Sequence, residues 1–403
     1  MVLRPSDLAA ELARLASRGQ GLWVAARADE DLASFLPVLA EIVARKREAA
    51  SALAAGGDLY DALLEDYEPG LTGAEVASMF DRMRPRLVSL RERILGSEKT
   101  PPAIAGNFAP DRQLAFTQKV AKTFGYDLSR GRIDLAVHPF SSGSGSDVRI
   151  TTRVDASDPF GCLYSTIHEV GHAAYEQHVD PAFRLTRLGQ GVSMGVHESQ
   201  SRIYENQLGR SRAFTGWLLG QMQDAFGRIE PAAADAFYAA VNAVHSGYIR
   251  TEADEVHYNL HIMLRFDLER ALMQGALEVG DLEEAWNTRF AADFGAEVDR
   301  PSKGMLQDVH WSAGLFGYFP TYALGNVYAG CLHAALRGAR AELDAELAAG
   351  DLSGATGWLA ENVQRHGAAL APREVIEVAA GMAVSEDPLL GYLDEKFSAL
   401  YGL

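Results

Sequence analysis

The chain has 403 residues, of which 48% are hydrophobic and 23% charged, enough for a large core in one domain or several. Its formal net charge of -17 argues against nucleic acid and anionic membranes as partners. Only Cys162 and Cys331 are cysteines, which excludes a disulfide framework and fits a reducing cytoplasm. We expect Cys162 to be a buried small residue rather than a catalytic thiol. We also expect neither a signal peptide nor a membrane-spanning helix, because the chain lacks apolar runs of the required length.

The first part of the chain, residues 6–95, has the periodicity of several antiparallel helices. Ser6 is placed to cap a helix through Leu15, and a longer helix is expected to open at Phe35. Thr72 and Glu75 have the spacing of a capping box, followed by an apolar stripe.

A change of period after residue 124 predicts a small β-element. Residues 132–138 and residues 147–153 alternate as strands, and the Gly/Ser-rich residues 141–146 read as a flexible turn between them. We therefore predict a hairpin of these two strands. Its edge could pair with an extended peptide.

The remainder of the chain is predicted to be mainly helical. Asp158 and Pro159 are a suitable N-cap and first residue for a long helix. A Gly-rich loop follows at residues 185–196, and residues 301–322 are aromatic-rich and irregular. Further helices are expected over residues 111–124, 198–209, 212–226, 231–277 and 281–294, and after Leu324.

A His-Glu-x-x-His string occupies residues 168–172 inside the long helix. His168 and His172 then lie one turn apart on one face, so both imidazoles can reach one ion. Glu169 lies beside them and can take a proton from a metal-bound water. Gly171 indicates that another backbone packs close. The alternative is a helix with two core histidines, but the flanking residues are apolar at helical spacing and favour the metal site.

A catalytic metal site needs a third protein ligand and an open position for water. Downstream candidates are His178, His197, Glu198 and Glu205. We favour Glu198, because a carboxylate on the next helix is the usual geometry of zincins with a glutamate ligand. Its alternative role is to interact with the dipole of its own helix. Glu169 would serve as general base and then as acid toward a leaving amine, which predicts metal-assisted peptide or amide hydrolysis.

Six motifs in a fixed order show that the chain resembles the carboxypeptidase Taq family of metallocarboxypeptidases. The resemblance runs from about residue 30 to the C-terminus. The motifs are His138-Pro139-Phe140, Asp147-Val148-Arg149-Ile150-Thr151, His168-Glu169-Val170-Gly171-His172, His197-Glu198-Ser199-Gln200, Ile249-Arg250-Thr251-Glu252-Ala253-Asp254 and Gly304-Met305-Leu306-Gln307-Asp308-Val309-His310-Trp311.

The resemblance implies a mainly α, zincin-like fold with a long cleft and a small antiparallel β-element beside the metal helix. We expect one domain over residues 1–403, with residues 1–97 as a helical cover and residues 98–403 as the catalytic core. It implies a homodimer that releases single C-terminal residues from peptides with broad specificity, using Zn2+ or Co2+; the location is expected to be cytoplasmic. The implied metal ligands are His168, His172 and Glu198, the catalytic residues are Glu169, His310 and Tyr322, and the substrate-binding residues are Arg250, Arg149, His138, His197, Gln307 and Asp308.

An exopeptidase that acts on C-termini needs a fixed cation, and the fork of an arginine matches a carboxylate with two bonds. Arg250 and Arg149 are the candidates. Each could instead form an internal ion pair, with Asp254 and Asp147 as local partners.

The roles of His310 and Tyr322 also have an alternative, since both could be core residues. A tyrosine hydroxyl near the metal could donate to the developing oxyanion. His197 is expected to contact a ligand or the substrate rather than to bind the metal.

One departure from the family is that its members are usually longer, with additional N-terminal helices that cover part of the cleft. Two further functions stay open. An endopeptidase or aminopeptidase could use the same core, although the arginine-bearing motif argues against it. A shortened relative could bind peptides without turnover, although Glu169 is intact.

Overall fold

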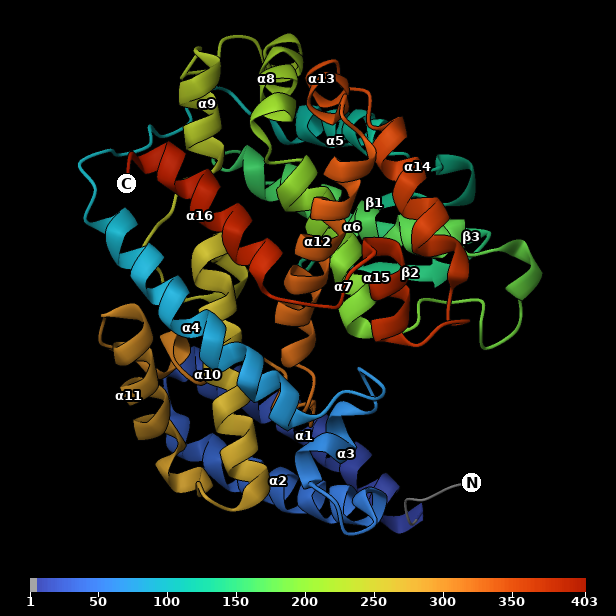
Figure 1. The fold of residues 1–403 in the computed structure, drawn as a ribbon. Helices are drawn as coiled ribbons and strands as arrows, with labels where there is room; N and C mark the ends of the chain where they lie inside the picture. The colour runs from blue at the N-terminus through green and yellow to red at the C-terminus, as the bar shows by residue number, and fades with distance from the viewer. Residues whose placement is uncertain (1–5) are drawn as a thin grey trace. The chain divides into compact units, whose positions relative to one another are not determined.

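The computed structural model describes residues 6–403 and is mainly helical with one three-stranded sheet (Figure 1). This confirms the predicted fold class. Within residues 6–403, no helix combines the length and the apolar character that crossing a bilayer requires. Cys162 and Cys331 are free and buried, and burial raises the pKa of both thiols, as expected of packing residues.

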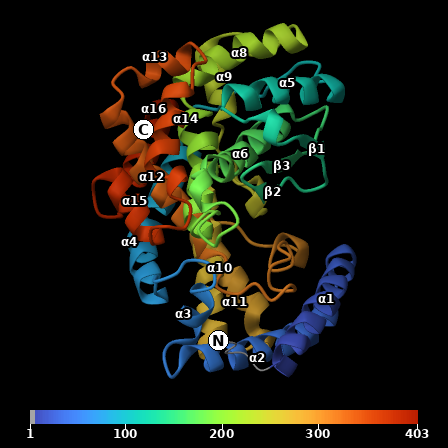
Figure 2. The same cartoon turned by 90° about the vertical axis from the view of Figure 1, so that its right-hand side faces the viewer.

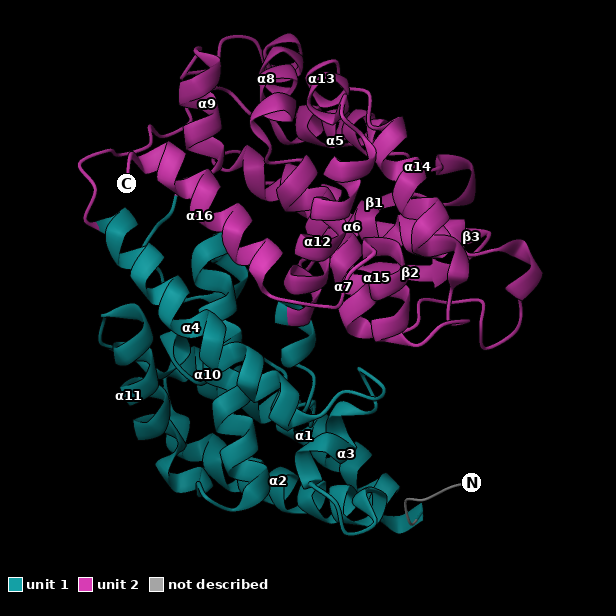
Figure 3. Ribbon diagram, viewed as in Figure 1, with its two compact units in different colours: residues 1–95, 244–323 teal, residues 96–243, 324–403 magenta. Residues whose placement is uncertain are grey.

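The chain divides into two compact units (Figure 3). Unit 1 comprises the described residues up to 95 together with residues 244–323, and unit 2 comprises residues 96–243 and 324–403. The first boundary falls close to the one predicted at residue 97. Residues 244–323, however, join the N-terminal segment instead of the predicted core. That the whole chain acts as one domain stays a prediction.

Unit 1 is organised around helix α10 (Glu255–Gln274), which is buried along most of its length and packs against four other helices. Its buried residues include polar and charged side chains as well as apolar ones, so they need partners inside the unit. Helix α1 extends past its predicted end at Leu15. The other elements are α1 (Ser6–Asp29), α2 (Leu32–Ala54), α3 (Leu59–Leu64), α4 (Gly73–Leu95), η4 (Arg250–Glu252), η5 (Val279–Asp281), α11 (Leu282–Phe294) and η6 (Pro301–Lys303).

Two helix starts in unit 1 show how short-range hydrogen bonds set the boundaries. The capping box is confirmed: Thr72 Oγ1 accepts from the Glu75 N–H at 3.2 Å, and Glu75 Oε2 accepts from the Thr72 N–H at 3.1 Å. Helix α2 begins earlier than predicted, because Asp31 caps it by accepting from the N–H of Ser34 at 3.3 Å.

Unit 2 is organised around helix α6 (Pro159–His178), which packs against α5, α7 and the sheet. Figure 2 shows α5 and the sheet beside α6. The unit contains further helices besides α6, α5 and α7 among them. They are α5 (Pro110–Thr123), η1 (Leu128–Arg130), η2 (Pro181–Phe183), α7 (Met194–Arg202), the π-helical η3 (Ile203–Leu208), α8 (Arg212–Phe226), α9 (Ala234–Val241), α13 (Leu343–Ala348), α14 (Ser353–Asn362), η7 (Gln364–His366), α15 (Pro372–Ala380) and α16 (Asp387–Tyr401), while α12 (Pro320–Ala339) begins in unit 1 and continues into unit 2.

The sheet differs from the predicted hairpin. It has the order β1-β3-β2, with β1 (Ile133–Leu135), β2 (Ser141–Ser144) and β3 (Asp147–Thr152). The two predicted strands pair in parallel, and the hairpin is formed by β2 and β3. The prediction was wrong because the Gly/Ser-rich segment taken for a turn is itself a strand. Gly145 at φ +57° makes the tighter turn that follows it.

Candidate active site

Helix α6 starts where the sequence predicts. Asp158 Oδ1 accepts a hydrogen bond from the N–H of Gly161 at 2.9 Å, and Pro159 occupies the first helical position, where it needs no donor. The helix is unbroken through His168 and His172, so both imidazoles project from one face.

Gly171 lets the backbone of α7 approach α6 between the two histidines. A Cβ at this position would lie 2.5 Å from the carbonyl oxygen of Gln200 and 2.6 Å from Cα of Ser201. The expectation of close backbone packing is therefore confirmed. Because α7 is held so close, Glu198, which precedes Gln200 and Ser201 on the same helix, reaches the histidine pair.

Helix α7 begins earlier than predicted, at Met194. Ser193 caps it, with Oγ accepting from the N–H of Val196 at 3.1 Å. Glu198 thus lies inside the helix, and the alternative role at a helix N-terminus does not apply. The predicted helix over residues 198–209 is completed by the π-helical turn η3.

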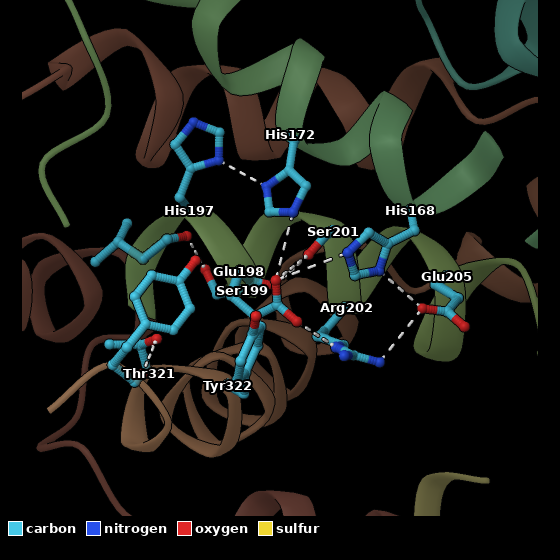
Figure 4. A network of polar contacts seen from close by, with 12 residues as sticks. His168, His172, His197, Glu198, Ser199, Ser201, Arg202, Glu205, Thr321 and Tyr322 are labelled. Atoms are coloured by element: carbon cyan, nitrogen blue, oxygen red, sulfur yellow. Dashed lines mark hydrogen bonds and ion pairs between the residues drawn. The ribbon is translucent and has the colours of Figure 1, made fainter. Parts of the chain in front are cut away.

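His168, His172 and Glu198 form a group that could hold a metal ion, with one ligand atom from each lying within 4.8 Å of the others. Glu198 Oε2 lies 3.7 Å from His168 Nε2 and 3.4 Å from His172 Nε2. Ligand atoms about 2.1 Å from a tetrahedral ion lie roughly 3.4 Å apart, which matches this spacing. Figure 4 shows the two imidazoles pointing toward Glu198.

The outer nitrogens of both histidines have partners that fix the tautomer. His168 Nδ1 lies 2.9 Å from Glu205 Oε2, and His172 Nδ1 lies 2.7 Å from His197 Nδ1. His197 Nε2 is in turn 3.1 Å from Glu176 Oε1. With protons on the outer nitrogens, the Nε2 lone pairs face the Glu198 oxygen, and a divalent cation is the species that suits such a donor set.

Two arginines hold the surrounding carboxylates in the charged form. Arg202 Nε donates to Glu198 Oε1 at 2.7 Å, whereas Oε2, which also accepts from the Ser201 hydroxyl at 3.2 Å, faces the two histidines. Burial raises the pKa of Glu198, but Arg202 and His168 outweigh it and hold the pKa well below its usual range. Arg210 Nη2 donates to Glu205 Oε1 at 3.2 Å. Burial likewise raises the pKa of Glu205, yet His168 and Arg202 lower it to about 2.

Glu169 lies next to the ligands on the same helix and is 7% exposed. Burial raises its pKa to about 7. A carboxyl with a pKa near neutrality can both take up and return a proton during a reaction.

The second group of predicted residues lies in unit 1. Arg250 pairs with Asp308 through Nε at 3.0 Å and Nη2 at 2.8 Å, both to Oδ1. The prediction of Asp254 as the local partner of Arg250 was wrong. Asp254 instead caps α10 by accepting from the N–H groups of Val256 and His257. Asp308 is thus an ion-pair partner of Arg250.

His310 and Tyr322 are brought together in the same unit, with His310 Nε2 3.1 Å from the Tyr322 hydroxyl. Burial lowers the pKa of His310 to about 4, so the imidazole is neutral near pH 7. Gln307 uses its side chain internally, since Oε1 accepts from the N–H of Arg250 at 2.9 Å and Nε2 donates to the carbonyl of Gly304.

Arg149 on β3 and His138 between β1 and β2 are both exposed. Arg149 forms the ion pair with Asp147 that was its alternative role, through two bonds of 2.9 and 2.8 Å. Of the alternative ligands, His178 bonds to the carbonyl of Ala174.

The sequence reasoning missed several charged residues around the two groups. Arg202, Arg210 and Glu176 support the metal group, and Arg265 on α10 binds Asp308. A signal was present for Arg265. It interrupts an apolar run in a helix that is buried on all sides, and a buried charge requires a partner.

A helical fold, a His-Glu-x-x-His helix and a glutamate on the following helix together define a metallopeptidase. The model of the carboxypeptidase Taq (M32) metallopeptidase family matches residues 3–397. The chain belongs to this family and is a metallocarboxypeptidase, a hydrolase of peptides.

The particular relatives agree with this assignment. The chain is 39% identical to thermostable carboxypeptidase 1 of Thermus thermophilus, over 99% of this chain and 80% of that protein. Its identity to carboxypeptidase 1 of Bacillus subtilis is 35%, over 96% of this chain and 78% of that protein. The crystal structure of an M32 carboxypeptidase from Deinococcus radiodurans superimposes with a TM-score of 0.96 at 41% identity, covering 100% of this chain and 82% of that one.

Proposed function

We propose that the protein releases single C-terminal residues from peptides with broad specificity, with Zn2+ as its metal and Co2+ as an alternative. His168, His172 and Glu198 would bind the ion. The observation that carries the proposal is the group of three ligand atoms within 4.8 Å, with Glu169 beside it on α6. When bound, a divalent ion supplies Lewis-acid chemistry that acidifies water and polarises a carbonyl.

The protein's own contribution to the reaction is proton transfer and orientation. Glu169 would take a proton from the attacking water at its carboxylate and later deliver it to the nitrogen of the leaving amine. A pKa of about 7, raised by burial, suits both steps. Glu205 and His197 would keep the ligand histidines in one tautomer through their Nδ1 atoms.

The terminal carboxylate of the substrate would bind to Arg250, and His310 and Tyr322 would contact the substrate near the scissile carbonyl. Arg149, His138, His197, Gln307 and Asp308 complete the proposed substrate-binding set. Support for Gln307 is indirect, because its amide fixes the backbone of Arg250.

A cytoplasmic location and a homodimer are parts of the same proposal. Two free, buried cysteines are compatible with a reducing compartment. The dimer rests on the family resemblance, and light scattering of the purified protein would test it.

The experiment that tests the function compares a mid-length peptide with its C-terminal amide, using metal-loaded protein and mass spectrometry. We expect stepwise loss of residues from the free acid only, abolished by a chelator. Glu169→Gln should lower kcat by about 10²- to 10⁴-fold, because the proton transfer loses its base. The metal content of this variant should stay that of the wild type, since Glu169 is not a ligand.

Other products would contradict the proposal. Cuts inside both peptides would favour an endopeptidase, and equal trimming of acid and amide would remove the role of Arg250. Absence of cleavage with either metal would favour the binding-protein alternative.

A further inference from the structure

Arg250 does not stand alone in unit 1 but belongs to a buried group of three charges. We call Arg250, Arg265 and Asp308 the Asp308 cluster. The two oxygens of Asp308 are divided between the two arginines. Arg250 binds Oδ1, and Arg265 Nε donates to Oδ2 at 2.7 Å. Asp308 therefore lies between the two guanidinium groups.

Arg265 is held by several contacts in this arrangement. Its side chain is fully buried, and Nη1 donates to the carbonyl of His261 at 2.7 Å. The guanidinium carbon lies 4.6 Å from the ring centroid of Trp286 and 5.4 Å from that of Phe319, both in cation–π range. Asp308 thus has a rigid partner on the side away from Arg250.

The charges of the cluster do not cancel. Two arginines and one aspartate leave one net positive charge, since burial lowers the pKa of His310 to about 4 and keeps that neighbour neutral near pH 7. Burial raises the pKa of Asp308, but Arg250 and Arg265 outweigh it and hold the pKa well below its usual range. A single ion pair of Arg250 with Asp308 would instead be neutral, with no charge left for an incoming carboxylate.

The guanidinium of Arg250 retains donors in addition to this charge. Nε and Nη2 donate to Asp308, and Nη1 donates to the hydroxyl of Tyr258 at 3.2 Å. Three of its five N–H groups are used, and no acceptor among residues 6–403 takes the second N–H of Nη1 or of Nη2. The two remaining N–H groups, one on Nη1 and one on Nη2, are donors that a carboxylate can accept from.

We propose that Arg265 is a positioning residue for recognition of the substrate's terminal carboxylate: it neutralises Asp308 from behind, so that Asp308 orients Arg250 without cancelling its charge. This rests on the proposed function, in which Arg250 binds that carboxylate. Arg265 itself need not touch the substrate.

The test measures KM and kcat for the peptide acid and the peptide amide in three variants. Arg265→Gln should raise KM for the acid by about 10- to 100-fold, the loss expected for a charged hydrogen-bonded contact, with a much smaller change in kcat. Arg265→Gln/Asp308→Asn restores one net positive charge and should recover most of that KM. Arg250→Gln should lose the preference for acid over amide.

KM is independent of the fraction of active protein, so partial misfolding of Arg265→Gln lowers kcat and leaves the readout intact. The double variant keeps the net charge of the wild-type cluster and carries the test if the single variant does not fold. Arg84→Gln is the matched control, because Arg84 is another arginine of unit 1 with an ion pair, to Asp267 at 2.6 Å. It should reduce stability and leave KM unchanged.

Two results would overturn the role of Arg265. One is a wild-type KM in Arg265→Gln, and the other is a double variant with KM raised as far as in Arg250→Gln. If wild-type protein cleaves acid and amide equally, or if Arg250→Gln keeps the preference, the proposed function itself fails at Arg250. If only the Arg265 variants behave like wild type, the proposed function stands and the positioning role falls.

Discussion

Glu205 accepts the outer N–H of His168 and is itself held by Arg202 and Arg210. This arrangement keeps the carboxylate charged and leaves the Nε2 lone pair of His168 available for a metal ion. Residues that hydrogen-bond to a metal-binding histidine usually contribute a factor of about 10 to 100 to metal affinity. Glu205 is therefore expected to act through His168 rather than as a ligand.

Glu205→Gln should weaken zinc binding by roughly 10- to 100-fold, because the neutral amide orients His168 less strongly. Competition with a chromophoric chelator measures this affinity. Glu361→Gln is the control, since Glu361 is an exposed glutamate of the same unit, on α14. Equal affinities of Glu205→Gln and wild type would show that the contact has no influence on the metal.

Single residues also show how far the sequence predicts the site. His168, His172 and Glu169 lie within one helical turn, so their arrangement follows from local periodicity. Arg265 and Asp308 are 43 residues apart, and their contact depends on tertiary packing that no local pattern encodes. The prediction that Arg250 would pair with the nearby Asp254 failed for the same reason, since its partner is Asp308.

At the scale of elements, the contact of α6 with α7 brings Glu198 to the histidines. Gly171 permits this contact, because the backbone of Gln200 and Ser201 occupies the space that a side chain at this position would need. A side chain here would force the two helices apart and separate Glu198 from the other two ligands.

Gly171→Ala should therefore lower the free energy of unfolding by about 1–3 kcal/mol and weaken metal binding, because the added methyl group overpacks this contact. Chemical denaturation and chelator competition measure the two effects. Gly216→Ala on α8 is the matched control. A Cβ at Gly216 meets nothing within 4 Å, so alanine should stabilise its helix by up to about 1 kcal/mol. Two variants with the same response would exclude the proposed close contact.

Some element ends that are set by local hydrogen bonds were predicted correctly, whereas the caps at Asp31 and Ser193 were missed. The box of Thr72 and Glu75 and the cap at Asp158 fall where expected. Strand β2 could not be predicted, because Ser141–Ser144 has little intrinsic strand preference and becomes a strand by pairing with β3. The parallel pairing of β1 likewise depends on tertiary contacts.

At the scale of the whole molecule, the metal ligands belong to unit 2 and the Asp308 cluster belongs to unit 1. This division was not predicted, because residues 244–323 join the N-terminal helices through packing around α10. A metal that binds only the folded ligand group stabilises that group against the openings that release the metal, by about 4 kcal/mol at a thousandfold excess over Kd.

Zinc should therefore slow amide hydrogen exchange most strongly in α6 and α7, and by a smaller factor in α1 and α2. Exchange measured by mass spectrometry with zinc and with chelator tests this expectation. Glu198→Gln, which removes a charged ligand, should reduce the difference between the two conditions. Equal slowing of all four helices would contradict a local effect, and no slowing in α6 would contradict the ligand assignment.

The stability of the whole chain should also depend on Glu269, a buried carboxyl on α10. It accepts hydrogen bonds from the Tyr60 hydroxyl at 2.8 Å, the Trp311 indole at 2.9 Å and the N–H of Gly317 at 3.1 Å. Burial nevertheless raises its pKa from 4.5 to about 7. Between these values the folded protein binds a proton that the unfolded chain has lost, so stability falls as pH rises.

The difference in free energy of unfolding between wild type and Glu269→Gln isolates this effect, because other titrating groups cancel. Between pH 4.5 and pH 8 the wild type should lose up to about 3 kcal/mol of stability relative to Glu269→Gln. This figure follows from the rise in pKa from 4.5 to about 7 at about 1.36 kcal/mol per pKa unit. Urea denaturation at several pH values measures it. A difference that stays constant over this range would mean that Glu269 titrates equally in the folded and unfolded chain, and that its three donors fully offset its burial.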